Sequence, residues 1–172
     1  MKKLIIVLFL FSLILSLCAC GGGVGKVSSA TDPLGYFMST RNWSLSEIEK
    51  QFGHFESSHE EKSHMYSFTQ YDNSNVSVFG ESWSFYVRIS DYTDRGIQHS
   101  GNFSFAQKNI SDKAFVAYRD DIIAHYTKLY GYPNQLYASS SMPAWVWTTP
   151  NLTIVLQDCR PETGNMNLTF TL

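Results

Sequence analysis

The chain has few cysteines and few charged residues. Only 3 of its 172 residues are cysteine, and two of these, Cys18 and Cys20, lie near the amino terminus. Beyond them only Cys159 remains, so no disulfide can form within the rest of the chain and stability must come from packing. Charged residues make up 16% of the sequence and the formal net charge is −2, which gives no support for a nucleic-acid partner.

Long apolar runs are also scarce. The run from residue 4 to residue 17 follows Lys2 and Lys3 and is shorter than the roughly 20 residues of a membrane-spanning helix. Three glycines follow it, beginning at Gly21, where a stop-transfer segment would carry basic residues. This pattern of a positive start, a short apolar core and a small residue near its end predicts a signal peptide.

The segment Leu17-Cys18-Ala19-Cys20 resembles the lipobox of bacterial lipoproteins. The resemblance implies that residues 1–19 are removed and that Cys20 receives diacylglycerol, often with a further acyl chain such as palmitate on the new amino terminus. Cys18 fits less well because Leu17, rather than a small residue, precedes it. The lipid bilayer is then a partner, and the protein is held outside the cytoplasm at the cell membrane, or at the outer membrane of a cell that has one. An ordinary secretory signal with incidental cysteines is the alternative.

Residues 20–35 are small and polar without periodicity, which predicts a lipidated cysteine followed by a flexible tether. Residues 36–172 are expected to form a single globular domain, because abundant aromatic residues argue against disorder. Loss of Lys2 and Lys3 with the signal peptide would change the formal net charge from −2 to −4.

Two helices are predicted in this domain. Ser44 and Glu47 form a capping-box pattern before a helix over 45–52, which Gly53 ends. A longer helix begins at Ser111 or Asp112 and ends at Gly131. Its apolar stripe consists of Phe115, Tyr118, Ile122, Tyr126 and Leu129.

Alternation of apolar and polar residues predicts short strands. They cover residues 65–69, 76–79, 83–90, 103–105, 144–148, 152–157 and 165–172, with a turn at 72–75. The short connections favour antiparallel pairing. The fold class is therefore α+β, with an antiparallel sheet covered on one face by two helices. Residues 44–91 and 111–172 share the order of a helix, a glycine and three strands, which suggests two repeats.

This arrangement resembles the α/β repeats of the β-lactamase-inhibitor-protein-like and outer-membrane-assembly-lipoprotein families. The residues that carry the resemblance are the helix end at 129–133, the strand Trp145-Val146-Trp147 and the apolar strand 152–156. Proteins of these families bind other proteins, so the resemblance implies recognition without catalysis.

Catalytic and metal-binding patterns receive little support. His54, His59 and His64 are surrounded by glutamates, which could form a metal site with them. Their five-residue spacing, however, would not place them on the same face of a helix or of a strand. No serine lies in a Gly-x-Ser-x-Gly motif, and Cys159 has no evident histidine partner. His125 lies near Asp121 on the predicted helix, an arrangement more typical of a surface hydrogen bond than of catalysis. No pattern indicates a cofactor.

Aromatic residues provide the other candidate site. Trp145 and Trp147 lie on the same side of one predicted strand, and Tyr137 precedes them. Such rings either stack on sugars or pack beneath the long helix. We therefore predict a non-enzymatic lipoprotein that binds an envelope or extracellular protein. The alternative is a glycan- or peptidoglycan-binding lipoprotein that uses the tryptophan strand, and an envelope hydrolase comes third.

A Cys20→Ala variant is expected to lose lipidation, because the thioether forms on that sulfur. Metabolic labelling with a radioactive fatty acid should mark the wild type and a Cys18→Ala control but leave Cys20→Ala unlabelled. Label that persists in Cys20→Ala would show that the anchor is assigned to the wrong residue.

Overall fold

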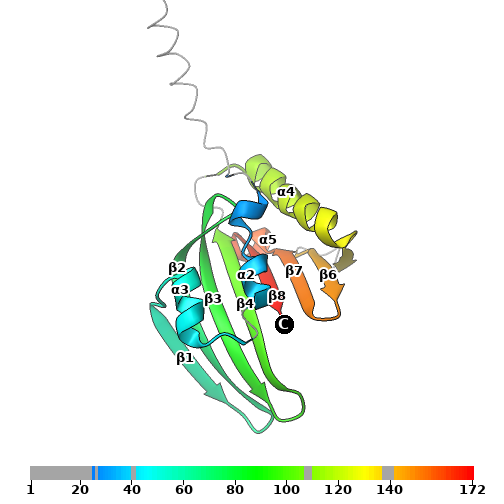
Figure 1. Ribbon diagram of the computed structural model, residues 1–172. Coiled ribbons are helices and arrows are strands. Elements are labelled where there is room, and N and C mark those ends of the chain that lie inside the picture. Colours follow the sequence, from blue (N-terminus) through cyan, green and yellow to red (C-terminus); the bar gives the residue numbers. More distant parts are fainter. Residues whose placement is uncertain (1–24, 26, 40–41, 107–109, 137–141) are drawn as a thin grey trace, which may run out of the picture.

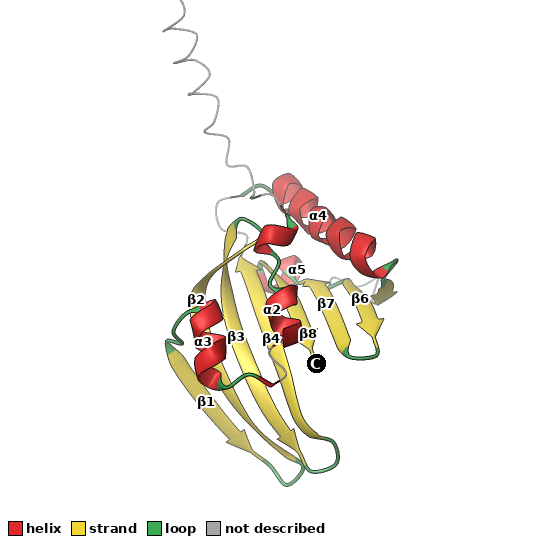
Figure 2. Ribbon diagram, viewed as in Figure 1, coloured by secondary structure: helices red, strands yellow, loops and turns green. Residues whose placement is uncertain are grey.

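The computed structural model describes residues 25, 27–39, 42–106, 110–136 and 142–172. It confirms the predicted α+β class: eight antiparallel strands form one sheet, with helices on one of its faces (Figures 1 and 2). The helical elements are the 3-10 helix η1 (Ser29–Thr31), α2 (Leu34–Ser39), α3 (Leu45–Phe52), α4 (Asp112–Tyr130) and α5 (Arg160–Thr163). The strands are β1 (Ser57–Lys62), β2 (Tyr66–Val78), β3 (Glu81–Tyr92), β4 (Gly96–Ala106), β5 (Asn134–Leu136), β6 (Ala144–Thr149), β7 (Leu152–Asp158) and β8 (Asn165–Thr171).

The sheet consists of two meanders that meet at their last strands. Its strand order is β1-β2-β3-β4-β8-β7-β6-β5, so β4 pairs with β8 at the junction. Helix α3 precedes the first meander and α4 precedes the second. The order of a helix followed by strands thus occurs twice, with four strands in each half. In the first half the strands predicted at 65–69 and 76–79 are both parts of β2, and the strand predicted at 103–105, beyond the repeat, is part of β4. The two strands that the sequence did not predict are β1 and β5, which lie at the two edges.

Both predicted helices are confirmed, together with their caps. The backbone N–H of Ser44 donates to Oε2 of Glu47 over 2.7 Å at the start of α3, and this bond lowers the pKa of Glu47. In α4 the hydroxyl of Ser111 accepts a bond from the N–H of Ala114, and Gly131 ends the helix with a φ of 80°. A residue with a Cβ at this position would be strained at that φ.

Two segments differ from the sequence prediction. The predicted turn at 72–75 is part of the continuous strand β2, whose register with β3 shifts between Asn73 and Val76. A β-bulge therefore takes the place of a chain reversal, because long flanking strands pair on both sides of it. The polar segment 57–62, for which no strand was predicted, forms the edge strand β1, in which every residue is exposed. An edge strand needs no apolar face, so hydrophobic alternation could not reveal it.

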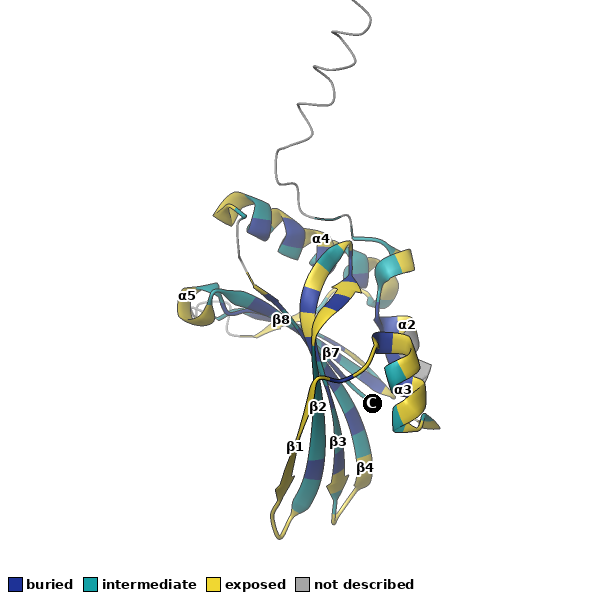
Figure 3. Cartoon of the chain, turned by 90° about the vertical axis from the view of Figure 1, so that its left-hand side faces the viewer, coloured by how far each residue is buried: buried dark blue, intermediate teal, exposed yellow. Residues whose placement is uncertain are grey.

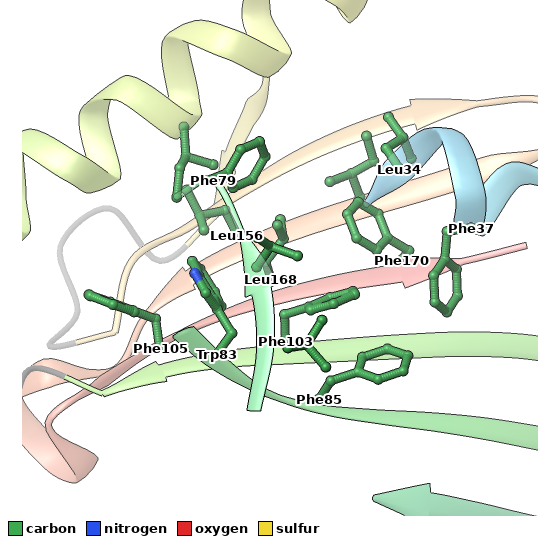
Figure 4. Packing of buried hydrophobic residues seen from close by; sticks show 14 of the residues in the cluster. Leu34, Phe37, Phe79, Trp83, Phe85, Phe103, Phe105, Leu156, Leu168 and Phe170 are labelled. Atoms are coloured by element: carbon green, nitrogen blue, oxygen red, sulfur yellow. The ribbon is translucent and has the colours of Figure 1, made fainter. Parts of the chain in front are cut away.

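The core lies between the sheet and α2, α3 and α4, and aromatic rings dominate it (Figures 3 and 4). Phe85 and Phe103 stack with centroids 4.4 Å apart, and Phe37 of α2 reaches Phe170 of β8 at 5.4 Å. Phe37 occupies the space above Gly101, where an added Cβ would lie 2.0 Å from the ring. Glycine at this position is therefore required for α2 to seat against the sheet.

The predicted tether needs correction. Residues 28–35 were expected to be flexible, but η1 and the start of α2 pack on the domain, and Leu34 is only 3% exposed. The backbone N–H of Phe79 donates to the carbonyl of Thr31 over 3.1 Å. The physical reason is the long-range contact with β2 and α4, which leaves no periodic pattern in such a short segment.

The predicted stripe of α4 is buried at four of its five positions. Phe115, Tyr118, Ile122 and Tyr126 are at most 1% exposed, whereas Leu129 is 51% exposed. Leu129 was therefore wrongly included, because it lines a groove between α4 and residues 29–38 that is open to solvent.

Ile122→Ala is expected to lower the free energy of unfolding by about 2–5 kcal/mol, because it leaves a cavity in a core site. Leu129→Ala on the same helix should change it by less than about 0.5 kcal/mol. Urea denaturation followed by circular dichroism measures both variants. Equal losses in the two variants would contradict the orientation of α4.

Candidate functional site

The face of the sheet opposite α2, α3 and α4 is a candidate site, because these helices do not cover it (Figure 3). Directly paired residues of antiparallel strands point to the same side. One row across this face runs from Gln70 through Arg88 and Ser100 to Thr171. We define the open face as the twenty outward residues of five strands: Tyr66, Phe68, Gln70, Asp72, Ser84, Tyr86, Arg88, Ser90, Tyr92, Gln98, Ser100, Asn102, Ser104, Thr153, Val155, Gln157, Asn165, Asn167, Thr169 and Thr171.

Hydrogen bonds between neighbouring strands order the polar side chains of the open face. Asn102 Nδ2 donates to Thr169 Oγ1 over 2.8 Å, across the junction between the two meanders. Arg88 Nη2 donates to Gln70 Oε1 over 2.9 Å, and Gln70 Nε2 donates in turn to Asp72 Oδ1 over 3.0 Å. A surface whose side chains are already ordered loses less conformational entropy when it binds a partner.

Arg88 is the central cation of the open face. Its guanidinium lies 4.1 Å from the ring centroid of Phe68 and 5.9 Å from that of Tyr86. Its Nε is buried without a hydrogen-bond partner among the described residues. Burial raises the pKa of Tyr86; the charge of Arg88 opposes this shift and that of Asp72 adds to it. Tyr86 therefore keeps its proton at neutral pH and remains a hydrogen-bond donor.

Trp145 and Trp147, the predicted aromatic site, have different environments. Trp147 is 2% exposed, packs on Tyr126 with centroids 5.5 Å apart, and donates from Nε1 to the carbonyl of Gly131 over 3.1 Å. It belongs to the core and has no free ring face for a sugar. Tyr137 lies outside the described residues. The predicted platform is therefore reduced to Trp145.

Trp145 lines a groove of about 590 Å³ between α4 and the β5 edge. Ile123, Tyr132 and Pro133 form its apolar wall, and Tyr132 is 95% exposed. Polar groups on the same groove come from Asp120, Thr127, Lys128 and Gln135. The groove thus combines aromatic surface with hydrogen-bonding side chains.

Arg119 fixes the position of Trp145, because its guanidinium lies 5.1 Å from the ring centroid. Its Nη1 also donates to the buried carboxylate of Asp158 over 2.8 Å, and Arg160 binds the same carboxylate. Burial alone would raise the pKa of Asp158, but the bonds from Arg160 and Arg119 outweigh it and hold the pKa below its ordinary value. Asp158 therefore stays ionised and anchors both arginines.

The predicted histidine candidates do not converge. His54 contacts Glu49 at 3.0 Å before β1, His59 lies on β1 with its ring 6.0 Å from that of Phe68, and His64 lies in the turn between β1 and β2. Among the described residues no group of three or more histidine, cysteine, aspartate or glutamate side chains could hold a metal ion.

His125 binds a partner that the sequence did not indicate. Its Nε2 lies 2.7 Å from Oδ2 of Asp32, not beside Asp121, and the hydroxyl of Tyr126 donates to Oδ1 of Asp32 over 2.9 Å. Asp32 is 93 residues away in sequence, so helical spacing could not reveal this pair. Cys159 is 5% exposed, and burial raises the pKa of its thiol, which makes it a poor nucleophile.

No family model, curated protein or solved structure matches this chain. The lipobox and the resemblance to the inhibitor-like and assembly-lipoprotein families therefore stay predictions. Cys20 lies outside the described residues, and within the described part of the chain no helix is long and apolar enough to cross a membrane.

Proposed function

We propose that this protein is a membrane-anchored bacterial lipoprotein whose domain binds another protein of the envelope or the extracellular space through the open face, without catalysis. The observation that carries this proposal is that the open face is uncovered and partly exposed at all but two positions, Phe68 and Ser90. Its side chains are mainly tyrosine, serine, threonine, asparagine and glutamine around one arginine. Tyrosine and arginine are enriched in protein interfaces, and serine and asparagine supply adaptable hydrogen bonds.

The size of the open face supports the same function. With strands about 4.8 Å apart and outward residues about 6.7 Å apart along a strand, each outward side chain covers about 32 Å². The twenty residues of the open face therefore span about 640 Å², close to the roughly 800 Å² that each partner contributes to a standard protein interface. The groove at Trp145 would accommodate a smaller ligand.

Photo-crosslinking tests the open face directly. A crosslinking amino acid at Asn102 or Thr169, in bacterial cells that secrete the protein, is expected to give one discrete protein adduct. The same group at Asp121, on the exposed side of α4, should give none. A second substitution, Tyr86→Ala, should reduce the adduct about 30-fold, the effect of about 2 kcal/mol at an interface hot spot, with an unchanged melting temperature. Adducts of equal yield from Asn102 and Asp121 would contradict the proposal.

The groove at Trp145 supports a second candidate function, the binding of peptidoglycan. The observation that favours this candidate is the aromatic wall of the groove, formed by Trp145 and the exposed Tyr132, with four polar residues around it. Soluble peptidoglycan fragments are then expected to shift the tryptophan emission of the wild type and to bind Trp145→Ala at least tenfold more weakly. Arg88→Gln on the open face is the matched control and should bind the fragments normally. Equal affinity for wild type and Trp145→Ala would exclude this candidate.

A further inference from the structure

The segment that leads into the domain is fastened to one end of the sheet. The backbone N–H of Gly25 donates to the carboxylate of Glu81, and Gly25 lies so close to Gly80 that an added Cβ would be 2.5 Å from its carbonyl carbon. Thr31 follows with its bond to Phe79. These contacts place the segment at the turn between β2 and β3, which we call the anchor end (Figure 1).

Asp32 fixes the same segment to α4. Its carboxylate accepts bonds from His125 and Tyr126 and a third from the backbone N–H of Leu34 over 2.9 Å. The side chains of His125 and Asp32 are only 12% and 9% exposed, so water competes little with this pair. Phe37 then enters the core over Gly101. The chain is thus attached to the domain from Gly25 onward.

Attachment at Gly25 leaves little free chain after the predicted lipid site. Only four residues separate Cys20 from Gly25. At about 3.5 Å per residue, the five steps between them reach at most about 18 Å, and a flexible chain of that length spans about 12 Å on average. The anchor end therefore cannot move far from a bilayer that holds Cys20.

We infer that the lipid bilayer is the surface that the anchor end faces, and that the turns between β1 and β2 and between β3 and β4 point away from it. This inference rests on the lipid anchor of the proposed function. Strand β2 runs from Val78 near the anchor end to Tyr66, and its 13 residues extend about 40 Å. Figure 1 shows these two turns at the opposite end of the sheet from the turn between β2 and β3.

This orientation specifies how a partner would reach the open face. The strands stand away from the membrane, so the open face is approached from the side. The far turns carry Met65, which is 63% exposed, and Arg95, whose guanidinium lies 4.0 Å from the ring of Tyr92. Ile97, near the start of β4, is 70% exposed. A partner that contacts these turns binds about 40 Å from the anchor end.

Energy transfer to labelled lipid tests the orientation in the full lipidated chain. The protein is placed in phosphatidylcholine–phosphatidylglycerol vesicles that contain an acceptor lipid, with a donor dye at Ser82→Cys near the anchor end or at Asp94→Cys in a far turn. Ser82 and Asp94 are both exposed, whereas Cys159 is buried. The dye that attaches to the chain without either substitution gives the background. Transfer from Ser82→Cys is expected to be at least threefold greater than from Asp94→Cys.

Two further variants show whether attachment causes the difference. A 12-residue glycine–serine insertion between Gly23 and Val24 should lower transfer from Ser82→Cys. The double variant Glu81→Ala, Asp32→Ala should lower it in the same direction, because it removes the carboxylates that hold Gly25 and the start of α2 and so lengthens the free segment. Equal transfer from both dye positions, in protein that still floats with the vesicles, would overturn the orientation while leaving an anchored binding protein intact. Protein that does not float with the vesicles would instead overturn the lipid anchor, and the orientation with it.

Discussion

The pairing of β4 with β8 is the constraint on which the rest of the structure depends. It sets Gly101 opposite Phe170 and Phe103 opposite Leu168, so the two meanders share one aromatic core. Phe37 bridges that junction, with centroid distances of 6.3 Å to Phe103 and 5.4 Å to Phe170. A single core over eight strands buries a larger fraction of its surface than two separate half-domains could. Packing of this kind stabilises the described part of the chain, whose one cysteine, Cys159, is free.

The open face follows from the same register. Because side chains alternate along a strand, pairing that directs aromatic residues toward the helices must direct the intervening residues to the opposite side. The intervening residues are tyrosine, serine, threonine, asparagine and glutamine, and their cross-strand hydrogen bonds join both halves at Asn102 and Thr169. The candidate binding surface is thus continuous only because β4 and β8 are neighbours, and its rigidity comes from the core behind it.

The amino-terminal segment connects this architecture to the predicted membrane anchor. Asp32 holds it to α4, and Phe37 holds it to the middle of the sheet. The segment is therefore a structural part of the domain, and the domain begins closer to Cys20 than composition suggested. Only four residues separate the predicted lipid site from Gly25, the first residue that contacts the domain.

The sequence by itself determined the two capped helices, most strands and the α+β class, because capping residues and alternation with period two act locally. It did not determine β1 and β5, whose residues gain pairing without burying an apolar face. Likewise, Trp145 and Trp147 share one side of a strand, yet only Trp147 becomes core. Trp147 packs on Tyr126, whereas Trp145 lines the groove between α4 and the β5 edge and stays partly exposed. The open face and the Asp32–His125 pair needed the tertiary structure, since both depend on residues far apart in the chain that only strand order and helix packing bring together.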